Sequence, residues 1–255
     1  MPLNPPRRAL WLLPLSLLLG NTASAQNCIS TQYGALAQGS YTIQNDEWGL
    51  ANNPGGWQQV CTGSAAGNSW SSTWWWATGS GGIKSYPSIY RGWQMGAWSP
   101  DAGGFPVQVS SQAPLPTQVS YSMSGNNQYD AAYDLFFSPS TNPGSPSGEM
   151  MVWLAYSGNR PAGNLVASGV TLGGMDGSWD VYQGSNGWPV WSFVRTAQTT
   201  SFSGKLQPFI YYLAYTLGWL NPSWYTLNTQ FGVEVIQSNG ANGSVNVSSF
   251  SASAR

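Results

Sequence analysis

Short segments with alternating apolar and polar residues, separated by clusters of Gly, Pro, Asn and Ser, fill the chain from about residue 40 to its end. A period of two places successive side chains on opposite faces of a strand, so this pattern predicts many short β-strands. Their spacing is typical of a β-sandwich or jelly roll. The segments are Ser40–Gln44, Ser72–Ala77, Gly82–Arg91, Val107–Ser111, Gln118–Met123, Asn127–Phe137, Gly148–Tyr156, Trp179–Gln183, Val190–Arg195, Gln230–Ile236 and Ser244–Phe250. We predict an all-β fold, a compact jelly-roll sandwich of two antiparallel sheets.

One segment has the period of a helix instead. Its apolar residues are Leu206, Phe209, Ile210, Leu213 and Leu217. Gly218 follows where such a helix would end. We predict one helix here, packed on the outer face of a sheet.

The N-terminal segment has the three parts of a secretory signal peptide. Arg7 and Arg8 precede an apolar run, Ala9–Leu19, and the small residues Ala23–Ala25 follow. We therefore expect residues 1–25 to be removed and the protein to be secreted. No change of composition and no internal repeat divides the remainder, so we predict a single catalytic jelly-roll domain over residues 26–255. The Pro- and Ser-rich run Ser138–Gly148 is interpreted as a long hairpin loop within it.

The composition limits the classes of molecule that the protein can bind. Charged residues make up only 7% of the chain, whereas aromatic residues make up 14%, including 15 tryptophans. Nucleic acid requires clustered Lys and Arg, which this chain lacks. An uncharged, aromatic-rich surface suits a neutral polysaccharide. We expect a monomer that binds such a polymer, with no nucleic acid partner and no membrane attachment after signal cleavage.

Cys28 and Cys61 are the only cysteines. In an exported protein the simplest expectation is one disulfide, which would join the N-terminal strand to its neighbour.

The chain contains no histidine, which excludes imidazole bases and histidine-ligated metals. Carboxylates must therefore carry any acid–base chemistry near neutral pH, and we expect no metal or organic cofactor. There are nine acidic residues, of which only Glu47, Glu149 and Glu234 are glutamates.

Strand alternation aims three of these acids away from the predicted core. In Gly148–Tyr156 the residues Met150, Val152 and Leu154 share one face, which leaves Glu149, Met151 and Trp153 on the other. By the same count, Glu234 opposes Val233 and Val235, and Asp134 opposes Tyr133 and Leu135. Each acid alone could be an ordinary exposed strand residue. Together they offer the carboxylate pair that glycoside hydrolysis needs, one ionised and one protonated.

Four short segments are informative together, and they are Ile83–Pro87, Tyr133–Phe136, the E-M-M-V-W-L stretch from Glu149, and Phe231–Glu234. In this order they resemble segments of glycoside hydrolase family 12. The resemblance runs from about Cys28 to Phe250. It implies an endoglucanase or xyloglucanase on a jelly roll with one helix.

The resemblance also implies roles for single residues. The nucleophile falls on Glu149, the acid/base on Glu234, and the aspartate that supports the nucleophile on Asp134. Met151 and Trp153 match residues of the cleft that follow the nucleophile. Trp48 matches a tryptophan that stacks on a distal sugar, with Asn45 or Asp46 as its polar neighbour. The family usually has Pro after the acid/base, where this chain has Val235.

For the remaining aromatic and acidic residues the sequence supports less specific predictions. Alternation gives Trp74 and Trp76 one face and Trp75 the other. The loop tryptophans that could line the cleft are Trp188, Trp219 and Trp224. Glu47 should point away from Trp48, and the acids expected in or near turns are Asp101, Asp130, Asp176 and Asp180.

The sequence therefore predicts a secreted, endo-acting, retaining enzyme that cleaves β-1,4-glucosidic bonds in cellulose-type or mixed-linkage glucans. Xyloglucan is the alternative substrate within the same family. A non-catalytic carbohydrate-binding jelly roll is the alternative from a different class.

Overall fold

A computed structural model of the chain describes residue 1 and residues 26–52, 55–78 and 82–255. The predicted signal peptide, residues 1–25, falls outside this part except for Met1. Within the described ranges, no helix is long and apolar enough to cross a membrane.

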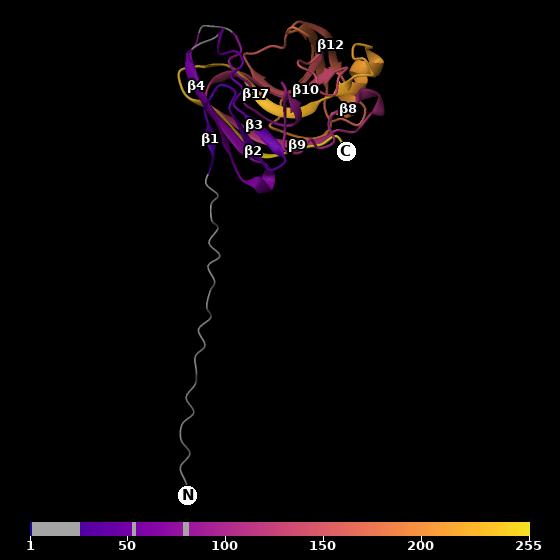
Figure 1. Cartoon of the computed structure of the whole chain (residues 1–255). Coiled ribbons are helices and arrows are strands. Elements are labelled where there is room, and N and C mark those ends of the chain that lie inside the picture. The colour runs from indigo at the N-terminus through magenta and orange to yellow at the C-terminus, as the bar shows by residue number, and fades with distance from the viewer. Residues whose placement is uncertain (2–25, 53–54, 79–81) are drawn as a thin grey trace.

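The strands form two sheets that lie one over the other (Figure 1). The smaller sheet has the order β1-β4-β5-β18-β9-β15, and its strands are Cys28–Ile29, Gly56–Thr62, Trp70–Trp76, Gly243–Ala252, Pro116–Ser124 and Ser201–Lys205. The larger sheet has the order β12-β13-β14-β11-β10-β17-β6-β3-β2, with strands Asn164–Val170, Trp179–Ser185, Pro189–Arg195, Gly148–Ser157, Asn127–Ser138, Asn228–Ser238, Ser88–Gln94, Tyr41–Gln44 and Ala35–Gln38. The short strands β7 (Ala97–Trp98), β8 (Val107–Gln108) and β16 (Tyr225–Thr226) extend it at the side. The predicted jelly-roll sandwich is confirmed.

The pairing differs from the prediction at one place, because β11 and β14 run parallel. A parallel pair cannot be closed by a tight hairpin and needs a crossover connection. Here the hairpin of β12 and β13 supplies that connection, between the end of β11 and the start of β14. The other strand pairings in the two sheets are antiparallel.

The main core fills the space between the sheets. Aromatic contacts cross this space, with ring centroids 5.4 Å apart for Tyr41 on β3 and Phe250 on β18, and 5.1 Å apart for Tyr121 on β9 and Phe231 on β17. The larger sheet therefore has one dry face. Its other face is free to carry polar side chains.

The predicted helix is present as α1 (Gln207–Tyr211), continued by a π-helical turn (η3, Tyr212–Thr216). Phe209 packs edge-on against Trp179 on β13 and Phe193 on β14, at 4.8 and 5.1 Å between ring centroids. Both partners belong to the main core. The helix thus lies on the same side of the larger sheet as the smaller sheet and extends the core. It does not cover an outer face, as the sequence had led us to expect.

Two local predictions are confirmed. Trp74 and Trp76 are fully buried, whereas Trp75 is 38% exposed, as strand alternation requires. The run Ser138–Gly148 connects β10 to β11, which pair as a hairpin.

The predicted disulfide joins Cys28 on β1 to Cys61 on β4, directly opposite each other in the sheet. The two cysteines are 33 positions apart in the sequence, so the bridge closes a long loop. Replacing both cysteines with alanine should lower the free energy of unfolding by about 3–4 kcal/mol, because the unfolded chain gains the entropy of the opened loop. Urea denaturation of the variant and the wild-type protein measures this loss. An unchanged unfolding midpoint would show that the bridge adds no stability.

Candidate active site

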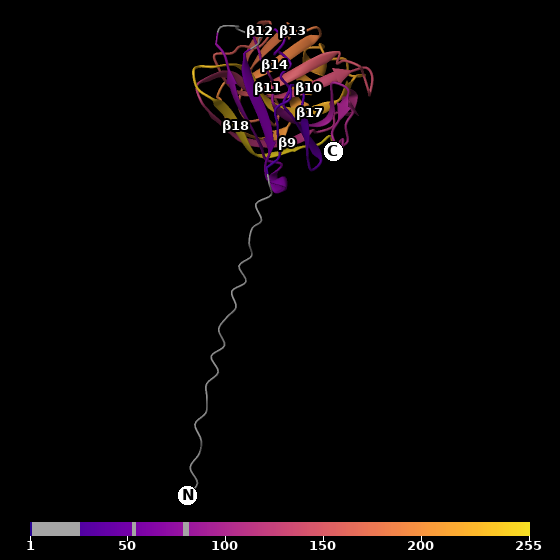
Figure 2. The ribbon, with the colours of Figure 1, turned by 60° about the vertical axis from the view of Figure 1, so that its left-hand side comes forward.

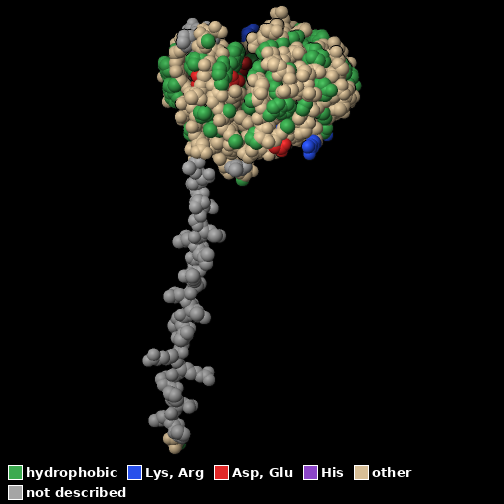
Figure 3. Space-filling model, viewed as in Figure 1, with side chains coloured by type: hydrophobic (Ala, Val, Ile, Leu, Met, Phe, Trp, Pro, Cys, Tyr) green, Lys and Arg blue, Asp and Glu red, His purple; other side chains and the backbone are tan. Residues whose placement is uncertain are grey.

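A cleft of about 380 Å³ crosses the face of the larger sheet that is turned away from the core. In the space-filling view, acidic side chains lie inside a hollow at the top of the molecule (Figure 3). Glu149, Glu234, Asp134 and Asp46 line this cleft together with aromatic side chains. It therefore collects four of the nine acids of the chain in one place.

Three adjacent strands, β17, β10 and β11, carry its floor (Figure 2). On β10, Asp134 lies opposite Met151 of β11 on one side and opposite Gln230 of β17 on the other. Glu149 lies opposite Phe136, and Glu234 opposite Asp130. The alternate residues Val152, Leu135 and Val233 are fully buried in the main core. The predicted faces of the three strands are confirmed.

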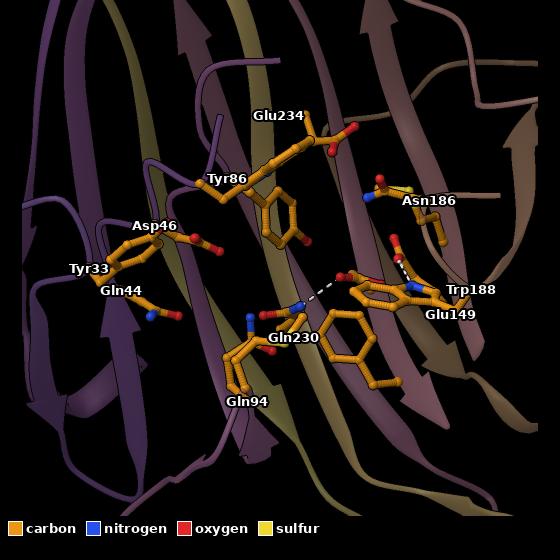
Figure 4. A pocket seen from close by; sticks show the side chains of 15 residues that line it. Tyr33, Gln44, Asp46, Tyr86, Gln94, Glu149, Asn186, Trp188, Gln230 and Glu234 are labelled. Carbon is orange, nitrogen blue, oxygen red and sulfur yellow. Dashed lines mark hydrogen bonds between the residues drawn. The ribbon is translucent and has the colours of Figure 1, made fainter. Parts of the chain in front are cut away.

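A glycine makes room for an aromatic side chain at the centre of this floor. Tyr86 lies over β17 and donates a hydrogen bond from its hydroxyl to the carbonyl of Ala132 at 2.9 Å. A Cβ on Gly232 would meet the Tyr86 ring at 2.9 Å and the Pro87 carbonyl at 2.6 Å, which is too close for any larger residue. Gly232 therefore allows the Tyr86 ring to lie in the cleft beside Glu234 (Figure 4).

Glu149 is 8% exposed and is held by one strong donor. The indole nitrogen of Trp188 donates to Glu149 Oε2 at 2.7 Å (Figure 4). Burial raises the pKa of Glu149 to about 7, and the Trp188 hydrogen bond acts in the opposite direction because it stabilises the ionised form. Trp188 therefore favours the carboxylate form that a nucleophile requires.

Asp134 is buried between the strands that carry the two glutamates. Its Oδ2 accepts a hydrogen bond of 2.7 Å from the Gln230 amide. Burial, and next the negative charge of Glu149, raise the pKa of Asp134 well above its ordinary value. The raised pKa favours the protonated form of Asp134, which adds no negative charge beside Glu149.

The surroundings of Glu234 favour the protonated form of its carboxyl group. Burial raises the pKa of Glu234 well above its ordinary value, and the charges of Asp130, Glu149 and Asp46 raise it further. Asp130 lies directly opposite Glu234 in the β10–β17 pair, so the two carboxyl groups face each other. Burial and neighbouring negative charge thus favour the neutral form of Glu234, while Trp188 supports the anion of Glu149. This is the division between acid and nucleophile that glycoside hydrolysis requires.

Comparison with known proteins agrees with this geometry. The family model of glycosyl hydrolase family 12 matches residues 39–255. The chain belongs to this family. It is 32% identical over 237 residues to Endoglucanase S of Pectobacterium parmentieri, covering 89% of this chain and 87% of that protein. It is 36% identical over 255 residues to xyloglucan-specific endo-beta-1,4-glucanase A of Emericella nidulans, covering 94% and 98%.

The fold matches a solved structure of the same family. A family 12 xyloglucanase from Bacillus licheniformis superposes with a TM-score of 0.81 at 32% identity, covering 90% of this chain and all of that one. As a member of family 12, the chain is a glycoside hydrolase, as its sequence predicts.

For Asp130 the location predicted from the sequence was wrong. It was expected in or near a turn, but it lies within β10, fully buried, opposite Glu234. The signal was present in the chain, since Asp130 is an even number of residues from Asp134 on the same predicted strand. Its side chain therefore belongs to the same face of the sheet.

The segment after β3 places Asp46, and not Asn45, at the cleft. Asn45 is fully buried, and its amide donates to Glu47 Oε1 at 2.6 Å. The expectation that Asn45 binds substrate is therefore corrected in favour of Asp46, whose pKa burial raises to about 7. Trp48 is 37% exposed and lines the cleft as predicted, and Glu47 points away from it into a buried site.

The other expected aromatic residues divide between the cleft and the core. Met151 lines the main cleft, and Trp153 lines a smaller adjoining pocket that also contains Trp48 and both catalytic candidates. Of the three loop tryptophans, only Trp188 lies in the cleft. Trp219 and Trp224 pack against the main core instead.

Val235 stands where the family usually has Pro, and the strand explains how the chain accommodates it. The Val235 amide donates to the Ser85 carbonyl at 3.0 Å, and β17 continues to Ser238. A proline at this position could not make that hydrogen bond.

Replacing Trp188 with phenylalanine should move the acidic limb of the pH–activity profile to higher pH by about one unit or more. A hydrogen bond to a charged group contributes about 1.5–3 kcal/mol, and one pKa unit corresponds to about 1.4 kcal/mol. The Trp188 bond lowers the pKa of Glu149, so its loss raises that pKa and less of the carboxylate is ionised at a given acidic pH. The measurement is kcat/KM against pH, with Trp219→Phe as the matched control. An acidic limb at the wild-type position in the Trp188 variant contradicts this role.

Proposed function

We propose that this family 12 enzyme is a secreted, endo-acting β-1,4-glucanase that hydrolyses cellulose-type or mixed-linkage glucans with retention of configuration. Glu149 acts as the nucleophile, Glu234 as the acid/base and Asp134 as the support of the nucleophile. The observation that carries the proposal is the opposite electrostatic setting of the two glutamates in one cleft. An indole donor stabilises the Glu149 anion, and neighbouring negative charge stabilises the neutral form of Glu234.

The first chemical step joins the substrate to the enzyme. A Glu149 oxygen attacks the anomeric carbon, the glycosidic bond breaks, and the proton of Glu234 passes to the departing oxygen. The product of this step is a glycosyl ester of Glu149 and a shortened glucan chain. Protonated Asp134 holds its place beside Glu149 throughout, positioned by the Gln230 amide.

The second step reverses these roles. The Glu234 carboxylate takes a proton from water, the resulting hydroxide oxygen attacks the anomeric carbon, and the bond to Glu149 breaks. Both steps invert the anomeric carbon, so the product keeps the β configuration. Glu149 leaves as a carboxylate and Glu234 regains its proton, ready for the next substrate.

Aromatic side chains that line the cleft together with the glutamates support a polymeric substrate. Trp48 lines the cleft and is exposed enough to stack on a pyranose ring. Such stacking uses the apolar C–H face of a neutral sugar, which agrees with the scarcity of cationic side chains in the cleft lining. An open cleft lined in this way suits attack within a chain.

Xyloglucan is the second candidate substrate, because several relatives are xyloglucan-specific endo-beta-1,4-glucanases and the superposed Bacillus licheniformis protein is a xyloglucanase. The test is the initial rate of reducing-sugar release from mixed-linkage β-glucan, amorphous cellulose and xyloglucan, together with the loss of viscosity. Faster release from the two unbranched glucans, with an early fall in viscosity, agrees with the proposal. Release from xyloglucan alone favours the second candidate, and product release without a fall in viscosity contradicts endo action.

We further propose that the mature chain begins near Gln26 and acts as an extracellular monomer. The disulfide between Cys28 and Cys61 supports export, because such bridges persist in oxidising compartments. Mass determination of the protein recovered from the culture medium tests the predicted cleavage site. Light scattering of the same sample tests the monomeric state.

A further inference from the structure

Asp130 is a buried acid that takes no direct part in either chemical step. It lies on β10 with no exposed surface and faces Glu234 across the β10–β17 pair. An ionisable group without solvent contact is costly unless its surroundings hold it by hydrogen bonds. The partners of its two oxygens therefore indicate what it does.

Each oxygen of Asp130 has a different neighbour. Asn159, in the loop after β11, donates from Nδ2 to Asp130 Oδ2 at 2.6 Å. Oδ1 accepts no hydrogen bond from a nitrogen or hydroxyl group of the described residues. Glu234 lies directly opposite Asp130 in the β10–β17 pair, so the two carboxyl groups face each other.

Two carboxyl groups can form a hydrogen bond only if one of them carries a proton. Asn159 supplies a donor to Asp130, which stabilises its ionised form. Glu234 has no such amide donor among the hydrogen bonds of the described part of the chain. The proton of the pair therefore belongs on Glu234.

We propose that Asp130 is a positioning residue for Glu234, whose carboxyl proton it accepts in a hydrogen bond, so that the acid/base enters each catalytic cycle as a proton donor. This inference rests on the proposed acid/base role of Glu234. Asp130 itself neither touches the sugar nor changes its covalent state. Once Glu234 has given its proton to the leaving oxygen, the two adjacent anions repel, which favours the uptake of a proton from water in the second step.

Other charged and titratable groups surround Glu234 and must be considered. They are Asp134 on β10, Glu149 on β11, Asp46 after β3, Tyr86 over β17, and Arg160, which lines the adjoining pocket. All of these remain in a variant that changes Asp130 alone. The difference between that variant and the wild-type protein therefore isolates the contribution of Asp130.

The test uses the fact that the chain has only three glutamates. Protein labelled with ¹³C at the side-chain carboxyl carbon of glutamate gives three resonances, which Glu47→Gln, Glu149→Gln and Glu234→Gln variants assign. Asp130→Asn keeps the shape of the side chain and can still accept the hydrogen bond from Asn159. We expect the titration midpoint of Glu234 to fall by about one pH unit or more in this variant, because a neighbouring negative charge is lost.

Two further variants make the result specific. Asn159→Ala removes the donor that stabilises the Asp130 anion, so the shared proton moves toward Asp130. The Glu234 midpoint should then fall by less than in Asp130→Asn. Asp176→Asn, the same chemical change at an exposed carboxylate paired with Arg195, should leave it unchanged.

An unchanged or higher Glu234 midpoint in Asp130→Asn would overturn the inference. The activity of the Glu234→Gln variant separates this failure from a failure of the proposed function. If that variant retains wild-type activity on β-glucan, Glu234 is not the acid/base and the inference falls with it. If Glu234→Gln is inactive but the titration midpoint of Glu234 is unchanged in Asp130→Asn, the proposed mechanism is kept and only the positioning role is wrong.

Discussion

Replacing Glu149 with alanine is expected to reduce the turnover of barley β-glucan or carboxymethylcellulose by at least about 10⁴-fold, the scale on which loss of a covalent nucleophile acts. Neither Glu234 nor Asp134 is suited to take over the attack. Burial and neighbouring negative charge raise the pKa of both groups well above the ordinary value, which favours their neutral forms. The measurement is kcat on a soluble glucan. Wild-type turnover in this variant would remove Glu149 from the mechanism.

The fold should survive this substitution, which keeps the kinetic result interpretable. Glu149 is almost completely buried, and alanine removes an ionisable group that burial disfavours. A wild-type thermal midpoint for Glu149→Ala is the control. Added azide should restore part of the activity, because the small anion fits the space of the missing carboxylate and attacks the anomeric carbon from the same side. The product is then an α-glycosyl azide, formed by a single inversion.

Replacing Glu234 with glutamine should give a different kinetic signature. Proton transfer by a positioned acid contributes about 10²–10⁴-fold, so turnover of β-glucan should fall by this factor. A substrate with a dinitrophenolate leaving group needs no proton to depart, and its first step should be almost unaffected. Burst kinetics should therefore show rapid release of dinitrophenol followed by slow turnover of the glycosyl-enzyme.

The third glutamate provides the matched control for this experiment. Glu47 is also buried, but it lies outside the cleft and accepts a hydrogen bond from Asn45. Glu47→Gln makes the same chemical change and keeps an acceptor for that bond, so wild-type kinetics are expected. Equal losses on glucan and on the dinitrophenyl substrate in Glu234→Gln would contradict the acid/base role.

The positions of both glutamates could be predicted from the sequence because regular strands have a fixed period. In β11 and β17 every second residue faces the core, and no bulge interrupts the count between Glu149 and Trp153 or between Gln230 and Glu234. The resemblance to family 12 then assigned a role to each glutamate, which strand geometry alone could not do.

The failures of prediction occur where the period breaks or where pairing is not local. Asp46 has a left-handed backbone with φ of 37°, which shifts the alternation and explains why Asp46, and not Asn45, faces the cleft. The parallel pairing of β11 with β14 depends on the path of the intervening hairpin, which no local pattern encodes.

Asp130 shows a third kind of failure, in which the pattern was sufficient but a residue preference outweighed it. Aspartate is common in turns, and this general tendency led us to place Asp130 there. The strand that contains it was nevertheless predicted, and counting by two from Asp134 places both acids on one face. The surroundings of Glu234 were therefore open to prediction from the sequence before the structure was known.

The configuration of the first-formed product tests the central claim most directly. Proton NMR of a cellooligosaccharide digest, recorded within the first minutes, distinguishes the α and β anomers of the new reducing end before they interconvert. If Glu149 and Glu234 carry out a double displacement, the β anomer appears first and the α anomer grows in later. If the α anomer appears first, water attacks the sugar directly, and the assignment of Glu149 as a covalent nucleophile is wrong.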